Sequence, residues 1–369
     1  MKRKSAFMMV SANIAAVVLL FLLVEGIASL AMVAQEFKNA RPVAERTHTR
    51  HDGDLGWVNI PGVSIKDMYG PGKYLKTNSQ GFRNNEEFAA EVPAGKIRIV
   101  CSGDSFTLGY GVGNDNTWCS RLGLVDGRIE AVNMGQGGYG ADQAFLWYKR
   151  DGTKIRHDVH LFAFITSDFI RMSSNSFLGY GKPVLAVENG VLVTKGVPVA
   201  KRSDVMVWLK GNLWRLNRLN SVRLAGVLLG KGGGKAEAIP PPARRKTREV
   251  VSEMMDELRR LNEKSGSVLA LVFLPTKSSD DEATRTWREY LREETKRKGI
   301  VYFDLHEEFL KMPYSTADTL FIKERDAKFS YAAGHYTEEG NARVAEILYT
   351  RLLGVPDVAK KLRHTVSGR

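Results

Sequence analysis

The sequence predicts an α/β fold in three layers, with a doubly wound parallel sheet between two layers of helices. Five short apolar segments have the length and β-branched content of buried strands. Amphipathic segments, in which apolar residues recur every three or four positions, lie between them. Strands that alternate with helices pair in parallel. The strands are expected at 96–103, 129–135, 159–168, 268–276 and 300–305, and the clearest helices at 247–266 and 283–299.

The composition is that of a globular protein with a basic surface. The chain has 369 residues, 43% of them hydrophobic, so it can bury a substantial core. Its 35 glycines follow no Gly-X-Y period and no longer unit recurs, which excludes collagen and solenoid proteins. The net charge of +13 suits an anionic neighbour, but no nucleic-acid-binding motif accompanies it, so we expect no nucleic-acid partner.

Both cysteines are expected to be buried as small apolar side chains. Cys101 lies within a strand segment and Cys119 near the start of a helix. Without a Cys-X-X-Cys motif or clustered histidines the sequence offers no structural zinc site, and we expect no metal and no cofactor. A disulfide between Cys101 and Cys119 is the alternative, because an oxidising compartment permits one where the Cα atoms lie within about 7 Å.

The N-terminus is expected to anchor the chain in a membrane. Residues 5–24 carry no charge, and at about 1.5 Å per residue they match a hydrocarbon core of about 30 Å. Lys2, Arg3 and Lys4 precede them, which places the N-terminus in the cytoplasm and the rest of the chain in the periplasm. The alternative is a cleaved signal peptide, although the apolar core of such peptides is usually about 7 to 15 residues long. Either way the domain is expected to be extracytoplasmic.

Four segments are expected along the chain. Residues 1–34 form the cytoplasmic N-terminus and the transmembrane anchor, and 35–95, rich in Gly, Pro and Asn, form an N-terminal extension of a tether and short strands. Residues 96–358 form the α/β domain, with an insertion at 175–246, and 359–369 form a basic tail.

The insertion has two recognisable parts. Residues 182–199 predict a β-hairpin, because Asn189-Gly190 lies between two β-rich runs. Residues 230–246 combine glycines, a proline run and basic residues, which is typical of a mobile surface loop.

Three residues are candidates for chemistry. Ser105 follows the first strand, at the edge where open α/β sheets bind ligands, and backbone N–H groups of the following helix start can bind an oxyanion there. Gly138 follows the second strand in a glycine-rich turn, so its N–H can approach a substrate closely. His335 stands in a loop before a helix, where it can act as a general base for Ser105.

The chain resembles the SGNH (GDSL-type) hydrolase family. The motifs that carry the resemblance are GDSFTLGYGV, NMGQGGYG and GHYTEEGN, and the segments LGW, TNSQGFR and the hairpin are similar to those of membrane-attached bacterial members. The resemblance implies an SGNH hydrolase-like fold. It also implies that Ser105 is the nucleophile, that His335 is the base, and that Gly138 contributes to the oxyanion hole.

The chain departs from the family pattern in two places. Where the family has a further block, Gly-X-Asn-Asp, this chain has 165–168, Ile-Thr-Ser-Asp, so Ser167 stands in place of the oxyanion asparagine. A serine hydroxyl can donate but reaches less far, and we expect Ser167 to assist Gly138 in the oxyanion hole. Where the family has an aspartate two or three residues before the histidine, this chain has Ala332 and Ala333. Asp326 is then a candidate for the missing acid if its loop folds back.

Two other aspartates are expected to be structural. Asp104 should accept hydrogen bonds from backbone amides of its own turn, and Asp304 should cap the end of a strand.

These observations predict a membrane-anchored, extracytoplasmic serine esterase or O-acyltransferase. Its substrate is expected to be an ester-linked acyl group, most plausibly acetyl, on an acylated polysaccharide of the cell envelope. The alternative is a catalytically impaired SGNH-fold protein that binds or assembles an envelope complex, and the two alanines before His335 motivate it.

Overall fold

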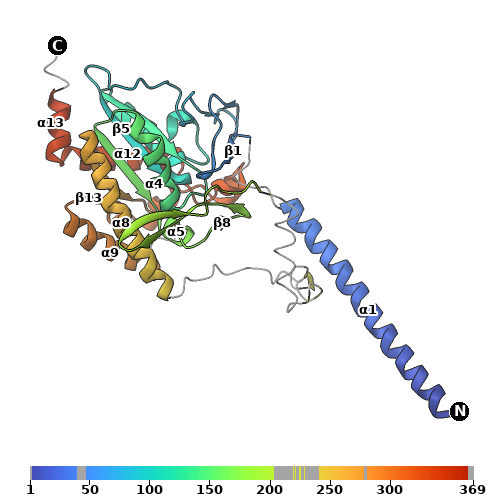
Figure 1. The fold of residues 1–369 in the computed structure, drawn as a ribbon. Coiled ribbons are helices and arrows are strands. Elements are labelled where there is room, and N and C mark those ends of the chain that lie inside the picture. Colours follow the sequence, from blue (N-terminus) through green and yellow to red (C-terminus); the bar gives the residue numbers. More distant parts are fainter. Residues whose placement is uncertain are drawn as a thin grey trace. The chain divides into compact units, whose positions relative to one another are not determined.

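The computed structural model describes residues 2–39, 47–202, 219, 221, 224–225, 228, 241–277 and 281–364 (Figure 1). The described residues belong to two compact units. One holds the N-terminal helix with the described residues from 202 to 228, and the other holds residues 47–201 and 241–364.

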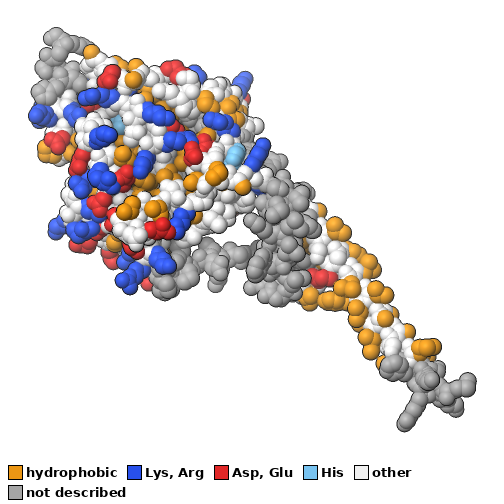
Figure 2. Space-filling model, in the orientation of Figure 1, with side chains coloured by type: hydrophobic (Ala, Val, Ile, Leu, Met, Phe, Trp, Pro, Cys, Tyr) orange, Lys and Arg blue, Asp and Glu red, His pale blue; other side chains and the backbone are white. Residues whose placement is uncertain are grey.

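The N-terminal helix is long and apolar enough to cross a membrane. Helix α1 (Lys2–Asn39) contains the predicted span, and the stretch Met8–Met32 has a mean hydropathy of 2.5. At about 1.5 Å per residue this stretch is about 37 Å long. Most of its apolar side chains are exposed along the helix, although Ala28 and Met32 are buried (Figure 2). A membrane anchor and a signal sequence both have these properties.

The second unit is built on a five-stranded parallel sheet, as predicted. Its strands, in spatial order β13-β12-β7-β5-β6, all pair in parallel. The chain passes from β5 to its neighbour β6 and then crosses back to β7 on the other side, so the strand order reverses between β5 and β7. Loops that leave the carboxyl ends of these strands diverge and open a crevice. The bounds are β5 (Ile97–Gly103), β6 (Ile129–Gly135), β7 (Val159–Phe164), β12 (Val268–Phe273) and β13 (Val301–Asp304).

Helices cover both faces of this sheet, which confirms the three-layer α/β fold (Figure 1). Successive side chains of a strand point to opposite faces. Val100 accordingly packs in one core, while Ile99 and Cys101 pack in the other. The first core includes α4 (Ala141–Arg150), α8 (Pro241–Ser265) and α9 (Glu282–Lys298); the second includes α3 (Trp118–Val125), α12 (Glu338–Leu353) and α13 (Pro356–His364).

The predicted hairpin is present. β10 (Val184–Glu188) pairs antiparallel with β11 (Val191–Lys195). Asn189 and Gly190 both have positive φ, 51° and 75°, as a two-residue turn between twisted strands requires. The other short elements are β1 (Thr49–Asp52), β2 (Gly56–Asn59), β3 (Ser64–Ile65), β4 (Leu75–Lys76), β8 (Ser176–Phe177), β9 (Tyr180–Gly181), α2 (Ser105–Leu108), α5 (Thr166–Arg171), α10 (His306–Leu310) and α11 (Tyr314–Thr319).

Two segment predictions need correction. Residues 359–364, predicted as tail, belong to α13, where Val358 and Leu362 are buried against the domain. Residues 241–246, predicted as loop, are the first turns of α8, because proline is tolerated at the start of a helix. The rest of the predicted loop, 230–240, lies outside the described residues.

The N-terminal extension is joined to the α/β domain by a buried arginine. Arg83, in the TNSQGFR segment, is 0% exposed. Its guanidinium donates to the carbonyl oxygens of Leu108, Gly109 and Val112, each at 2.6 Å, and to Oδ1 of Asn114 at 3.0 Å. A charge buried without a carboxylate is stabilised here by several backbone dipoles. The extension and the turn after α2 therefore form one structure.

We predict that Arg83→Met destabilises the protein by at least about 3 kcal/mol, because three buried carbonyl groups lose their donors at about 1–3 kcal/mol each. Urea unfolding of the detergent-solubilised full chain measures this change. The matched control is Arg260→Met, whose side chain is 67% exposed and whose loss should cost less than about 0.5 kcal/mol. Equal costs for the two variants would contradict the role of Arg83.

Candidate active site

Ser105 is presented by a tight turn from strand to helix. It is the first residue of α2, and Asp104 before it accepts a hydrogen bond from the Phe106 N–H at 2.9 Å, as predicted. A Cβ atom at Gly103 would lie 2.3 Å from Oγ1 of Thr107 and 2.6 Å from the Ala163 carbonyl oxygen. Only glycine fits there, so the end of β5 can turn directly into α2.

His335 meets Ser105 across 230 residues of sequence. The distance between Ser105 Oγ and His335 Nε2 is 2.7 Å. The loop before α12 holds the histidine, because Ile322 exchanges backbone hydrogen bonds with His335 and Gly334, each at 2.8 Å. The ring of Phe106 stacks on the imidazole at 4.3 Å between centroids. The structure thus brings together the predicted nucleophile and the predicted base.

No carboxylate holds the other ring nitrogen of His335 in the part of the chain that the structure describes. Its Nδ1 is buried. The backbone of Ala332 and Ala333 lies close enough to favour a proton there, but the alignment is too poor for a proper hydrogen bond. Asp326 is not the missing acid, because its side chain is 61% exposed and faces Arg325 at 3.7 Å.

His335 is a neutral base at physiological pH. Its pKa is lowered from 6.5 to about 4, mainly because burial penalises the imidazolium and also because the positive charge of Arg171 lies nearby. The surface of the ring is partly exposed, but protein atoms surround it densely. At pH 7 its Nε2 lone pair can therefore accept the Ser105 proton.

Two backbone N–H groups are available beside Ser105. Among the described residues, neither Ser105 N–H nor Gly138 N–H has an acceptor. The turns that carry them are joined by a hydrogen bond from Gln136 N–H to the Gly103 carbonyl, 3.1 Å long. Gly138 has φ +76°, and a Cβ there would lie 2.7 Å from the Phe177 ring. The geometry is compatible with two oxyanion donors.

Ser167 is not joined to the other candidates. It is the second residue of α5, which follows β7, so it lies at the same edge of the sheet as Ser105. Its side chain is exposed, and it makes no hydrogen bond to the described residues. Its predicted role in the oxyanion hole stays a prediction.

Sequence reasoning missed a buried charged cluster beside the site. Arg171 Nη1 donates to Asp168 Oδ1 at 2.5 Å and lies 3.4 Å from Asp104 Oδ2. Burial raises the pKa of both carboxyl groups, that of Asp168 far above its ordinary value, while the positive charge of Arg171 opposes this rise. Arg171 follows Ser167 by one helical turn, so both lie on one face of the helix, and this spacing could have predicted that Arg171 lies near the site.

A second serine–histidine pair is structural. Ser102 Oγ and His160 Nε2 are 2.6 Å apart, but both side chains are buried between the sheet and α8, where Asn262 contacts the other ring nitrogen at 3.2 Å. The cysteines are also structural, since Cys101 and Cys119 are both buried and free. Asp304, as predicted, accepts the N–H of His306 and also binds Arg288.

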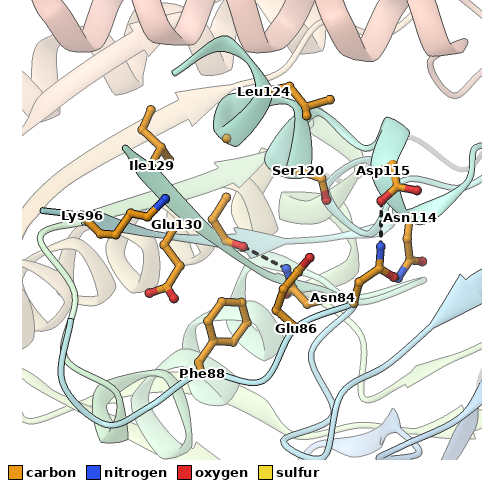
Figure 3. A pocket seen from close by; sticks show the side chains of 13 residues that line it. Asn84, Glu86, Phe88, Lys96, Asn114, Asp115, Ser120, Leu124, Ile129 and Glu130 are labelled. Atoms are coloured by element: carbon orange, nitrogen blue, oxygen red, sulfur yellow. Dashed lines mark hydrogen bonds between the residues drawn. The ribbon is translucent and has the colours of Figure 1, made fainter. Parts of the chain in front are cut away.

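A polar cavity of about 350 Å³ lies beside the amino-terminal half of edge strand β6 (Figure 3). Asn84 reaches the backbone of β6 in this cavity, through a hydrogen bond of 2.9 Å to the Ala131 carbonyl. Its walls include Glu86, Phe88 and Glu130 but not Ser105, Gly138 or His335. This cavity is therefore separate from the candidate active site at the carboxyl end of β5.

Comparisons with known proteins found similar solved structures. No family model and no curated protein matches the chain. Similar solved structures include a lipolytic protein of the G-D-S-L family from Desulfitobacterium hafniense (16% identity, TM-score 0.37, 69% of this chain and 99% of that one). They also include the lipase/acylhydrolase of Enterococcus faecalis (12%, 0.41, 70% and 96%) and an acetyl xylan esterase (13%, 0.37, 69% and 99%). These are lipolytic and esterase proteins of the kind that the motifs resemble.

Proposed function

We propose that this protein is a serine esterase or O-acyltransferase that uses Ser105 as nucleophile and His335 as base. The observation that carries the proposal is the 2.7 Å contact between Ser105 Oγ and the neutral Nε2 of His335. A hydroxyl is a weak nucleophile at pH 7 and needs such a base.

The reaction follows from this geometry. Ser105 Oγ attacks the acyl carbonyl carbon while its proton passes to His335 Nε2, and the carbonyl π electrons move to the oxygen. The N–H groups of Ser105 and Gly138 donate to that oxyanion. The C–O bond to the alcohol then breaks, and the His335 Nε2 proton passes to the departing alkoxide. Water or a sugar hydroxyl next attacks the acyl-serine, with His335 again as base, and releases the acid or the new ester.

The substrate and location rest on the N-terminal helix and the family resemblance. We propose that α1 anchors the chain, with Lys2 to Lys4 on the cytoplasmic side, and that the α/β unit acts outside the cytoplasm. The family resemblance and this location together imply an envelope glycan, and we propose an O-acetyl group on such a polysaccharide as the substrate.

The unpartnered Nδ1 of His335 favours one alternative, a catalytically impaired binding protein. In serine proteases the loss of the aspartate behind the histidine costs about 10⁴ in kcat. Here the backbone at Ala332 and Ala333 is a weaker substitute for that aspartate.

Ser105→Ala should abolish covalent labelling by a fluorophosphonate probe and lower the melting temperature only slightly, because the partly exposed His335 can bind water in place of the lost hydroxyl. Ser102→Ala is the matched control, since it removes the hydroxyl of the other serine–histidine pair. It should keep full labelling but cost about 1–3 kcal/mol, because it leaves His160 without its partner. Labelling that survives in Ser105→Ala would refute the proposed nucleophile.

Ala333→Asp should raise the hydrolysis of p-nitrophenyl acetate about tenfold. The new carboxylate can accept the Nδ1–H of His335 and stabilise the imidazolium formed during attack, although unrefined geometry keeps the gain far below the limit of about 10⁴. The control is Ala333→Asn, which lacks the charge, and adding Ser105→Ala should remove the gain. A rate in Ala333→Asp that stays at the Ser105→Ala background would favour the binding protein.

A reporter fused after Arg369 should be active only outside the cytoplasm. The three basic residues that precede the apolar span should keep the N-terminus inside. Paired alkaline phosphatase and green fluorescent protein fusions measure this, because the first needs the periplasm and the second the cytoplasm. Fluorescence without phosphatase activity would overturn both the location and the proposed substrate.

A further inference from the structure

Arg171 links the two turns that carry the proposed oxyanion donors. Its Nη1 donates to the carbonyl oxygen of Tyr139, the residue after Gly138, at 2.9 Å. The same nitrogen lies 3.4 Å from Oδ2 of Asp104, the residue before Ser105. An arginine is thus fixed beside both backbone amides that would receive the substrate carbonyl.

The Arg171 guanidinium has N–H groups that donate to none of the described residues. Arginine has five N–H groups, and the three hydrogen bonds that the structure gives the Arg171 side chain all involve Nη1. Within the described residues, Nε and Nη2 have no acceptor, and the side chain is 18% exposed. These nitrogens are therefore available to a ligand that enters the site.

Phe177 fixes the position of this group. The Arg171 guanidinium lies 5.2 Å from the centroid of the Phe177 ring. The edge of the same ring lies against Gly138, 2.7 Å from where a Cβ would be. A stacked guanidinium has little rotational freedom, so Arg171 is held close to the Gly138 amide before any substrate binds.

We propose that Arg171 is a third oxyanion donor, whose free N–H groups bind the acyl carbonyl oxygen and stabilise it as it becomes negative. This inference rests on the proposed esterase or acyltransferase function. Residue 167, where the family has its asparagine, is a serine, and Arg171 is on the same face of α5 one turn later. A charged donor is stronger than a neutral amide, so it can replace the asparagine.

The electrostatics of the site agree with this position. The charge of Arg171 lowers the pKa of His335, so the guanidinium lies near the reacting pair. The other ionisable groups of the cluster are Asp104 and Asp168, whose pKa values burial raises. The hydrogen bonds from Arg171 to Asp168 and to the Tyr139 carbonyl hold the guanidinium in place, so it needs no rearrangement when the oxyanion forms.

Two variants separate this role from a structural one. Arg171→Lys keeps a cation for Asp168 but loses the fork of donors. Arg171→Met combined with Asp168→Asn removes the donor together with the carboxylate that it binds at 2.5 Å, and leaves Asp104, whose pKa burial raises, as the remaining carboxyl group of the cluster. Both are purified as the full chain in detergent and compared with wild type by melting temperature, ester kinetics and fluorophosphonate labelling. Arg343→Met, exposed on α12, is the control for loss of an arginine.

We expect kcat to fall about 100-fold in the double variant and about tenfold in Arg171→Lys, with KM nearly unchanged, since the loss of one oxyanion donor costs about 10² to 10³. Added guanidinium chloride at millimolar concentration should restore part of the rate of the double variant and should leave the rate of Arg343→Met unchanged. The pKa of His335 is about 4 in the wild-type protein. In the double variant this pKa, measured by NMR, should be higher.

The inference is overturned if the folded double variant keeps its kcat within threefold of wild type, or if only KM changes. A wild-type protein that neither hydrolyses esters nor reacts with the probe would instead refute the proposed function. The two failures are therefore distinguishable.

Discussion

The charge of Arg83 is the constraint on which the site depends. A guanidinium removed from water must find acceptors for its N–H groups, and here the backbone of the turn after α2 supplies them at Leu108, Gly109 and Val112. The burial of one side chain therefore fixes the shape of the loop that follows Ser105. The N-terminal extension, which sequence composition separates from the domain, is an integral part of the site.

A second constraint comes from the missing carboxylate. Without an aspartate behind it, His335 has no negative neighbour at Nδ1, and burial together with Arg171 keeps its imidazole neutral. A neutral imidazole can take a proton but gains little stabilisation once it has done so. The groups that can stabilise charge in this site, Arg171 and the backbone amides, therefore lie beside the proposed oxyanion and not beside the base.

The fold could be predicted well because the strand, helix and turn patterns of the sequence all indicate the same architecture. Buried parallel strands are nearly continuous apolar runs, and Asn189-Gly190 has the conformation that the hairpin needs. The pairing of Ser105 with His335 follows from the family motifs, since no local pattern relates residues so distant in the chain. The sequence-based predictions failed at charged residues. The lysines of α13 led us to expect a basic tail, although Val358 and Leu362 form an apolar face, and a buried arginine is indistinguishable in sequence from a surface arginine.

The two serine–histidine pairs show what makes one of them a candidate for catalysis. Their hydrogen bonds differ by only 0.1 Å, at 2.6 Å for Ser102 and 2.7 Å for Ser105, so distance does not distinguish them. Ser102 lies within β5, where its histidine is held by Asn262 and no substrate can enter. Ser105 comes after the strand has ended, between diverging loops, with unpaired amides beside it. The reversal of strand order beside β5 places the pair of Ser105 and His335 where open α/β sheets bind ligands, and this position, more than the pair itself, makes it the candidate.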